Sequence, residues 1–197
     1  LVTRSEVLAA VRLAGSLLRL ETSTGARGLD WTMSGEALSL RAFRGTGLVC
    51  GALSGADTLV ASYKGYRRPD PSKDSVLLVY PDGRRGVAAL RGWVAAPDTL
   101  CGGGPLVGRV VLRLASAVPT GAVIARVFER GSYTLSRRAL RYRRGAGGRQ
   151  PLTPELWESI TGWRQVGPRL EAELIHRGAG SQDEEQRWRV PVAPASP

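Results

Sequence analysis

Beyond residue 22 the sequence is a series of short apolar segments separated by Gly, Pro and Asp, and the helical period of 3.6 residues does not return over any long window. Short segments rich in Val, Leu, Ala and aromatic residues, with such boundaries, are typical of β-strands. Because no crossover helices alternate with them, we predict that the strands pair antiparallel. The predicted strands are Ala37–Arg44, Thr58–Tyr66, Ser75–Tyr80, Gly86–Ala95, Arg109–Ala115, Ala122–Arg130, Arg169–His176 and Gln186–Val192.

The segment before these strands has the pattern of a helix. Thr3 and Glu6 have the spacing of a capping box, and apolar residues follow at helical spacing at Val7, Val11, Ala14 and Leu18. An amphipathic helix must bury its apolar stripe, so the predicted fold class is α+β, with the N-terminal helix packed on antiparallel sheet. We assign residues 1–22 to the helix, 23–190 to a β-rich globular domain and 191–197 to an extended tail.

Two smaller elements are predicted in the last third of the chain. Tyr133–Ser136 and Ala139–Tyr142 flank the dipeptide Arg137-Arg138, which predicts a tight hairpin even though the Asn-Gly or Asp-Gly of favoured turns is absent. Pro154–Thr161 begins with a proline, a residue favoured at the first position of helices, and a short helix is predicted there.

Few residues indicate catalysis. His176 is the only histidine, whereas His-based zinc sites usually need more than one and a Ser-His-Asp site would have to use this residue alone. On a strand His176 falls in phase with Leu170 and Leu174, which favours packing at a sheet margin. Asp70–Asp74 resembles the start of a calcium loop, but Ser75 replaces the required Gly, so a hairpin turn is predicted. We expect no catalytic residue, metal or cofactor; a secreted hydrolase that uses His176 is an alternative.

The two cysteines, Cys50 and Cys101, lie 51 positions apart and lack the spacing of a zinc ribbon or a redox pair. We predict a disulfide between them, which would stabilise the fold by about 4 kcal/mol in the loop-entropy model. A disulfide indicates an oxidising compartment, such as the periplasm or the cell surface. Two buried free thiols in a cytosolic protein are the alternative.

The charge of the chain is concentrated. Lys and Arg number 28 against 17 Asp and Glu, a net charge of +11, and the segment 126–149 holds eight arginines against Glu129 alone. Guanidinium groups on one face of a hairpin suit phosphates and carboxylates, so DNA or another acidic polymer is a candidate partner. A solvated basic hairpin, a charged edge strand or contact with an acidic partner subunit are the alternatives. The candidate polyanion-binding residues, called the hairpin arginines below, are Arg137, Arg138, Arg141, Arg143, Arg144 and Arg149.

Several segments read in series resemble a known family. They are Leu17–Glu21, Leu29–Trp31, Leu38–Gly45, Val49-Cys50, Gly131–Ser136, Ala139–Arg143 and Trp188–Val190. Together they resemble the periplasmic part of minor pilins and minor pseudopilins, the pilin-like subunits of type IV pili and type II secretion systems. The resemblance is one of pattern and spans most of the chain.

The resemblance implies a pilin-like fold in which residues 1–22 are the C-terminal part of a long spine helix and Cys50 and Cys101 form the structural bridge. It implies a non-enzymatic subunit that helps assemble, initiate or cap a filament, with other pilin or pseudopilin subunits as partners. Anchoring in the bacterial inner membrane, before assembly in the periplasm or at the cell surface, would use an apolar helix expected upstream of Leu1. A DNA-uptake minor pilin that binds DNA through the basic hairpin is the alternative.

Overall fold

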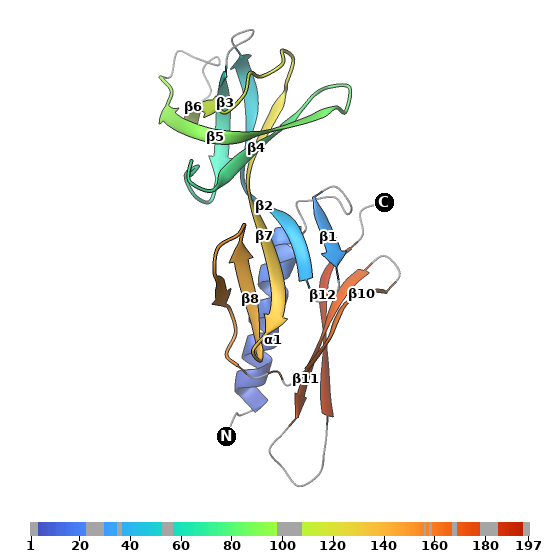
Figure 1. The fold of residues 1–197 in the computed structure, drawn as a ribbon. Helices are drawn as coiled ribbons and strands as arrows, with labels where there is room; N and C mark the ends of the chain where they lie inside the picture. The colour runs from blue at the N-terminus through green and yellow to red at the C-terminus, as the bar shows by residue number, and fades with distance from the viewer. Residues whose placement is uncertain are drawn as a thin grey trace. The chain divides into compact units, whose positions relative to one another are not determined.

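The computed structural model describes residues 4–22, 30–34, 37–52, 57–97, 108–155, 157, 159–166, 169–177 and 185–194. The chain forms two compact units, one made of residues 1–42 and 130–197 and the other of residues 43–129. The elements, shown in Figure 1, are α1 (Arg4–Thr22), β1 (Trp31–Ser34), β2 (Ala37–Ala52), β3 (Thr58–Gly65), β4 (Asp74–Val79), β5 (Arg85–Ala95), β6 (Gly108–Leu114), β7 (Ile124–Ser136), β8 (Ala139–Arg144), β9 (Arg149–Pro151), β10 (Ser159–Val166), β11 (Arg169–Arg177) and β12 (Glu185–Pro194).

The 43–129 unit is a closed antiparallel barrel of six strands. Its strands follow the order β2-β3-β6-β5-β4-β7, and pairing of β2 with β7 closes the ring. The Val49 amide donates to the Val123 carbonyl over 2.9 Å at this closure. Closure leaves every strand of the barrel with two neighbours, so the barrel has no free edge.

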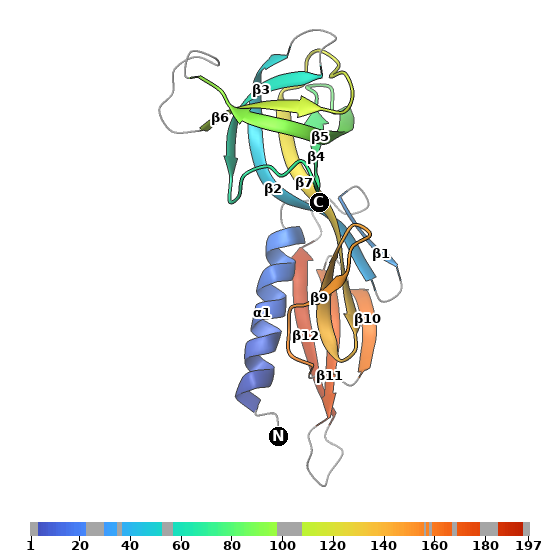
Figure 2. The ribbon, with the colours of Figure 1, turned by 60° about the vertical axis from the view of Figure 1, so that its left-hand side comes forward.

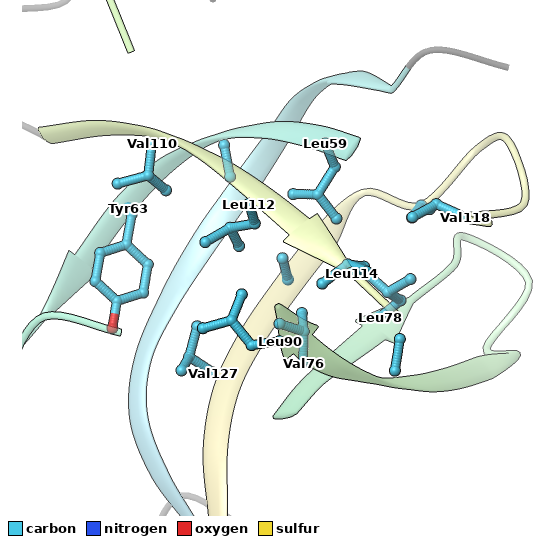
Figure 3. Packing of buried hydrophobic residues seen from close by; sticks show 14 of the residues in the cluster. Leu59, Tyr63, Val76, Leu78, Leu90, Val110, Leu112, Leu114, Val118 and Val127 are labelled. Carbon is cyan, nitrogen blue, oxygen red and sulfur yellow. The ribbon is translucent and has the colours of Figure 1, made fainter. Parts of the chain in front are cut away.

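Residue alternation explains which side chains fill the barrel. Along β6, Val110, Leu112 and Leu114 are buried, whereas Arg113 between the last two is exposed. Side chains of a strand point alternately to its two faces, so every second residue lines the interior. Figure 3 shows the resulting cluster, which includes Leu59, Tyr63, Val76, Leu78, Leu90, Val110, Leu112, Leu114, Val118 and Val127.

The other unit contains α1, the outer portions of β2 and β7, and the remaining strands. β1 pairs with β2, β8 lies between β7 and β9, and β10-β11-β12 form a separate three-stranded sheet. Helix α1 lies beside β12 (Figure 2). Its apolar stripe enters a core that also holds Trp31, Leu38, Tyr133, Leu140 and Trp157; the buried helix residues are Val7, Ala10, Ala14 and Leu18.

The predicted α+β, pilin-like fold is wrong. The chain is mostly β, and the described residues contain one short helix and a closed six-stranded barrel rather than a long helix packed on a sheet. The physical reason is that a closed barrel buries its own apolar residues and needs no helix to cover them. Within the described helical residues, no stretch is long and apolar enough to cross a membrane.

The bounds of the 23–190 domain stay a prediction; within them, residues 43–129 form a compact unit. Three local expectations differ from the structure. The predicted short helix at Pro154–Thr161 is wrong, because Ser159 begins β10 and pairs with β11. Residues 191–194 of the predicted tail belong to β12, and 195–197 lie outside the described residues. A turn does form at Asp70–Asp74, but it is not a hairpin turn, because β3 and β4 are not neighbours.

Candidate anion-binding surfaces

The β7–β8 hairpin forms where the sequence predicts it. Ser136 pairs with Ala139, so Arg137 and Arg138 are the two central residues of the turn. Their φ angles are +49° and +61°, as a type I′ turn requires. Both side chains are exposed, and the Arg138 carbonyl accepts a hydrogen bond from the Trp157 amide over 3.0 Å. The sequence therefore places two arginines at the tip in a conformation that favours Asn and Gly.

One of the hairpin arginines is used by the fold. Arg141 Nη2 lies 2.7 Å from Oε1 of Glu155, and its Nε donates to the Ser136 carbonyl over 3.0 Å. Only 11% of its side chain is exposed. Arg141 therefore ties β8 to the segment after β9, and its charge is already compensated.

Arg143 and Arg149 lie directly opposite each other on the antiparallel strands β8 and β9. Arg143 donates from Nε to the Gly147 carbonyl over 3.1 Å and from Nη2 to the Ala146 carbonyl over 3.3 Å. These bonds hold the glycine-rich loop but leave the positive charge uncompensated. Within the described part of the chain, no carboxylate forms an ion pair with Arg137, Arg143, Arg144 or Arg149.

The remaining predicted site residues lie elsewhere. His176 is on β11 opposite Gln186, and its side chain lies outside the described residues. Cys50 is on β2 and is disulfide-bonded, whereas its predicted partner Cys101 lies outside the described residues, so that pairing stays a prediction. Among the side chains that the structure describes, no group of three or more His, Cys, Asp or Glu could hold a metal ion.

The sequence analysis missed a second basic surface, which lies on the barrel. A groove of about 530 Å³ is lined by Lys64, Tyr66, Arg68 and Trp93 together with the buried residues Tyr63 and Arg109. We call it the aromatic groove. No carboxylate is among its described lining residues. The run Tyr63-Lys-Gly-Tyr-Arg-Arg68, in which aromatic and basic residues alternate with one glycine, is the signal that could have found it.

A network of ion pairs holds the segment that forms one wall of the aromatic groove. Arg67 makes a two-point ion pair with Asp74 and a further one with Glu129 at 3.1 Å. Glu129 also accepts from Arg44 over 3.0 Å, and Arg44 donates a short hydrogen bond to the Tyr66 hydroxyl. The pKa of Arg67 is raised above its ordinary value, chiefly by its hydrogen bond to Asp74.

The buried Tyr63 completes this wall. Its hydroxyl donates to the Arg67 carbonyl over 3.3 Å. Burial, together with the negative charge of Asp74, raises the pKa of Tyr63 to about 12. Tyr63 is therefore a neutral hydrogen-bond donor at physiological pH, which keeps the backbone of the 63–68 segment in place.

Comparison with protein-family models, with curated proteins and with solved structures finds no match for this chain. The chemistry of the hairpin arginines and of the aromatic groove therefore follows from their geometry alone. Both surfaces present guanidinium groups to solvent, and such groups bind phosphates and carboxylates.

Proposed function

We propose that this protein is a non-enzymatic binding protein that engages an acidic polymer through the hairpin arginines other than Arg141, whose charge Glu155 already compensates. The observation that carries the proposal is the cross-strand pair Arg143–Arg149, two like charges opposite each other with no carboxylate partner among the described residues. Like charges directly opposite on antiparallel strands are destabilising. A phosphate or carboxylate between them would remove the repulsion and gain charge-assisted hydrogen bonds.

The turn at the tip of β7–β8 supports the same function. Arg137 and Arg138 both adopt positive φ, a backbone conformation that is disfavoured for residues other than Gly, Asn or Asp. Residues in disfavoured backbone conformations tend to cluster where their side chains are needed for function. Two exposed guanidinium groups at a tip extend the charge of Arg144 and Arg149 along the hairpin.

The other functions considered from the sequence have less support. The filament-subunit role implied by the pilin resemblance stays a prediction, and the fold expected with it is not the fold observed. The secreted hydrolase also stays a prediction, since nothing is described around His176 beyond its strand pairing. If the His176→Ala variant kept any detected hydrolytic activity unchanged, the hydrolase prediction would be excluded.

The proposal is tested by measuring affinity for a fluorescent DNA duplex and for inorganic polyphosphate over a range of salt concentrations. The double variant Arg143→Gln/Arg149→Gln should weaken binding of both probes and lower the salt slope for the duplex by about 0.9 for each lost phosphate contact. The matched control is Arg91→Gln/Arg113→Gln, which removes two exposed barrel arginines and the same charge. Equal losses in the two double variants would show that net charge alone attracts the probes and would overturn the proposal.

A further inference from the structure

The aromatic groove combines two chemistries that the hairpin lacks. Tyr66 and Trp93 offer aromatic rings, while Lys64 and Arg68 offer exposed positive charges. A volume of about 530 Å³ lies within the range of sites that hold small molecules or parts of polymers. We infer that this groove binds single-stranded nucleic acid, with an unpaired base stacked on Tyr66 and the adjacent phosphates beside Lys64 and Arg68.

Tyr66 is arranged as a stacking platform. The residue is 64% exposed, yet its hydroxyl donates to the Phe43 carbonyl over 3.2 Å and accepts a short hydrogen bond from Arg44. The Arg44 guanidinium carbon also lies 5.7 Å from the centre of the Tyr66 ring. An exposed ring whose polar end is already fixed loses little rotamer freedom when a ligand stacks on it.

Trp93 and Arg68 supply the second contact. The Arg68 guanidinium carbon lies 5.8 Å from the centre of the Trp93 ring, within the distance of a cation–π contact. The indole thus orients an arginine that has no ion pair with any described residue. An oriented guanidinium beside the partly buried indole of Trp93 matches the alternation of phosphates and bases along a single strand.

The network beneath the groove keeps this wall rigid. Arg67 is bound by Asp74 and Glu129, and Glu129 also binds the Arg44 that holds Tyr66. These contacts satisfy the buried charges internally, so Arg67 and Arg44 are not the groups that bind a ligand. The positive charges left for phosphates are those of Lys64 and Arg68.

Single strands are favoured over duplexes because a duplex keeps its bases stacked and unavailable to Tyr66, whereas unpaired bases of any sequence can stack on an aromatic ring. The inference concerns a different surface from that of the proposed function and does not depend on it. It predicts a preference for an unpaired base, which charge alone cannot produce.

The test uses the whole protein, a fluorescent oligothymidylate of about 12 nucleotides, its duplex with oligoadenylate, and inorganic polyphosphate. Tyr66→Leu and Trp93→Leu should each weaken oligothymidylate binding about fivefold or more and leave polyphosphate binding unchanged. Tyr66→Phe keeps the ring and should retain most of the affinity. Arg68→Gln should weaken binding more than Arg91→Gln, which removes the same charge outside the groove.

The outcomes separate the two proposals. If Tyr66→Leu and Trp93→Leu, folded as judged by circular dichroism, bind oligothymidylate as tightly as the unmodified protein, the groove inference is overturned. It is also overturned if the two variants lose affinity for oligothymidylate and for polyphosphate by the same factor. If Arg143→Gln/Arg149→Gln binds the duplex and polyphosphate as tightly as the unmodified protein, the hairpin proposal fails. The groove inference stands in that case if the groove variants still bind oligothymidylate more weakly.

Discussion

Arg67 and Asp74 form a two-point ion pair in the barrel, with Nη1 2.7 Å from Oδ2 and Nη2 2.6 Å from Oδ1. The Asp74 side chain is fully buried, and its Oδ2 also accepts from the Asp70 amide over 2.7 Å. This carboxylate therefore joins β4 to the turn before it and to the wall of the aromatic groove. Losing it would leave the partly buried Arg67 guanidinium with one carboxylate partner instead of two.

Replacing the buried carboxylate should destabilise the barrel. Breaking a buried pair by removing one partner typically costs about 3 kcal/mol or more, so Asp74→Asn should lower the free energy of unfolding by this amount in urea titrations. Lys73→Gln breaks the more exposed Lys73–Asp70 pair and should cost less than about 1 kcal/mol. Equal effects of the two substitutions would contradict a structural role for Asp74.

Tyr63 should make the barrel sensitive to alkali. Its pKa is about 12 in the folded protein against 10.0 ordinarily, so the unfolded chain loses this proton first. The stabilisation from neutral Tyr63 is thus complete below pH 10 and is lost as the pH rises towards 12. Urea midpoints of the unmodified protein and Tyr63→Phe should converge over this interval. A difference that stays constant from neutral pH to pH 12 would contradict the burial of an ionisable group.

Gly65 is required by the close packing of Tyr63. A Cβ at this position would lie 2.6 Å from the Arg44 carbonyl oxygen and would also meet the Tyr63 hydroxyl. Gly65→Ala should therefore destabilise the protein by about 1–3 kcal/mol in thermal or urea unfolding. Gly92→Ala is the matched control, since nothing lies within 4 Å of its Cβ and its stability should change little. A neutral Gly65→Ala would show that the packing at Tyr63 is loose.

The tip of the β7–β8 hairpin should be stabilised by a better turn sequence. Arg137→Asn combined with Arg138→Gly places preferred residues at φ of +49° and +61° and should raise the free energy of unfolding by about 1 kcal/mol. Arg137→Gln combined with Arg138→Gln removes the same charges but keeps the unfavourable backbone. It should weaken polyphosphate binding as much as the Asn-Gly variant without the gain in stability. Equal stabilities of the two variants would show that the backbone conformation carries no cost.

Local patterns in the sequence predicted most individual elements. The capping-box spacing and apolar stripe placed α1 correctly, because a helix brings residues three and four apart to one face. The two-residue turn at Arg137-Arg138 followed from the apolar segments on either side of it. The helix predicted at Pro154–Thr161 failed because pairing with β11 outweighed a weak local preference.

The basic charge of the hairpin could also be predicted from the sequence. Which of its arginines are left without a carboxylate partner, and so can bind an anion, could not. Arg141 is compensated by Glu155, 14 positions later, whereas Arg143 faces Arg149. Both relationships depend on the path of the chain through β9. Spacing along the sequence does not distinguish an arginine that is used internally from one that is left to bind an anion.

The sequence by itself determined where most of the strands run and which of their side chains alternate, since these depend on neighbours one to four positions apart. The tertiary structure alone decided that β2 and β7 close a barrel and that Glu129 reaches Arg44 across 85 positions. An open sheet and a closed barrel share the same alternation of apolar and polar residues, so only long-range strand pairing separates them. The Arg44–Glu129 ion pair, which supports the wall of the aromatic groove, joins the two strands of that closure.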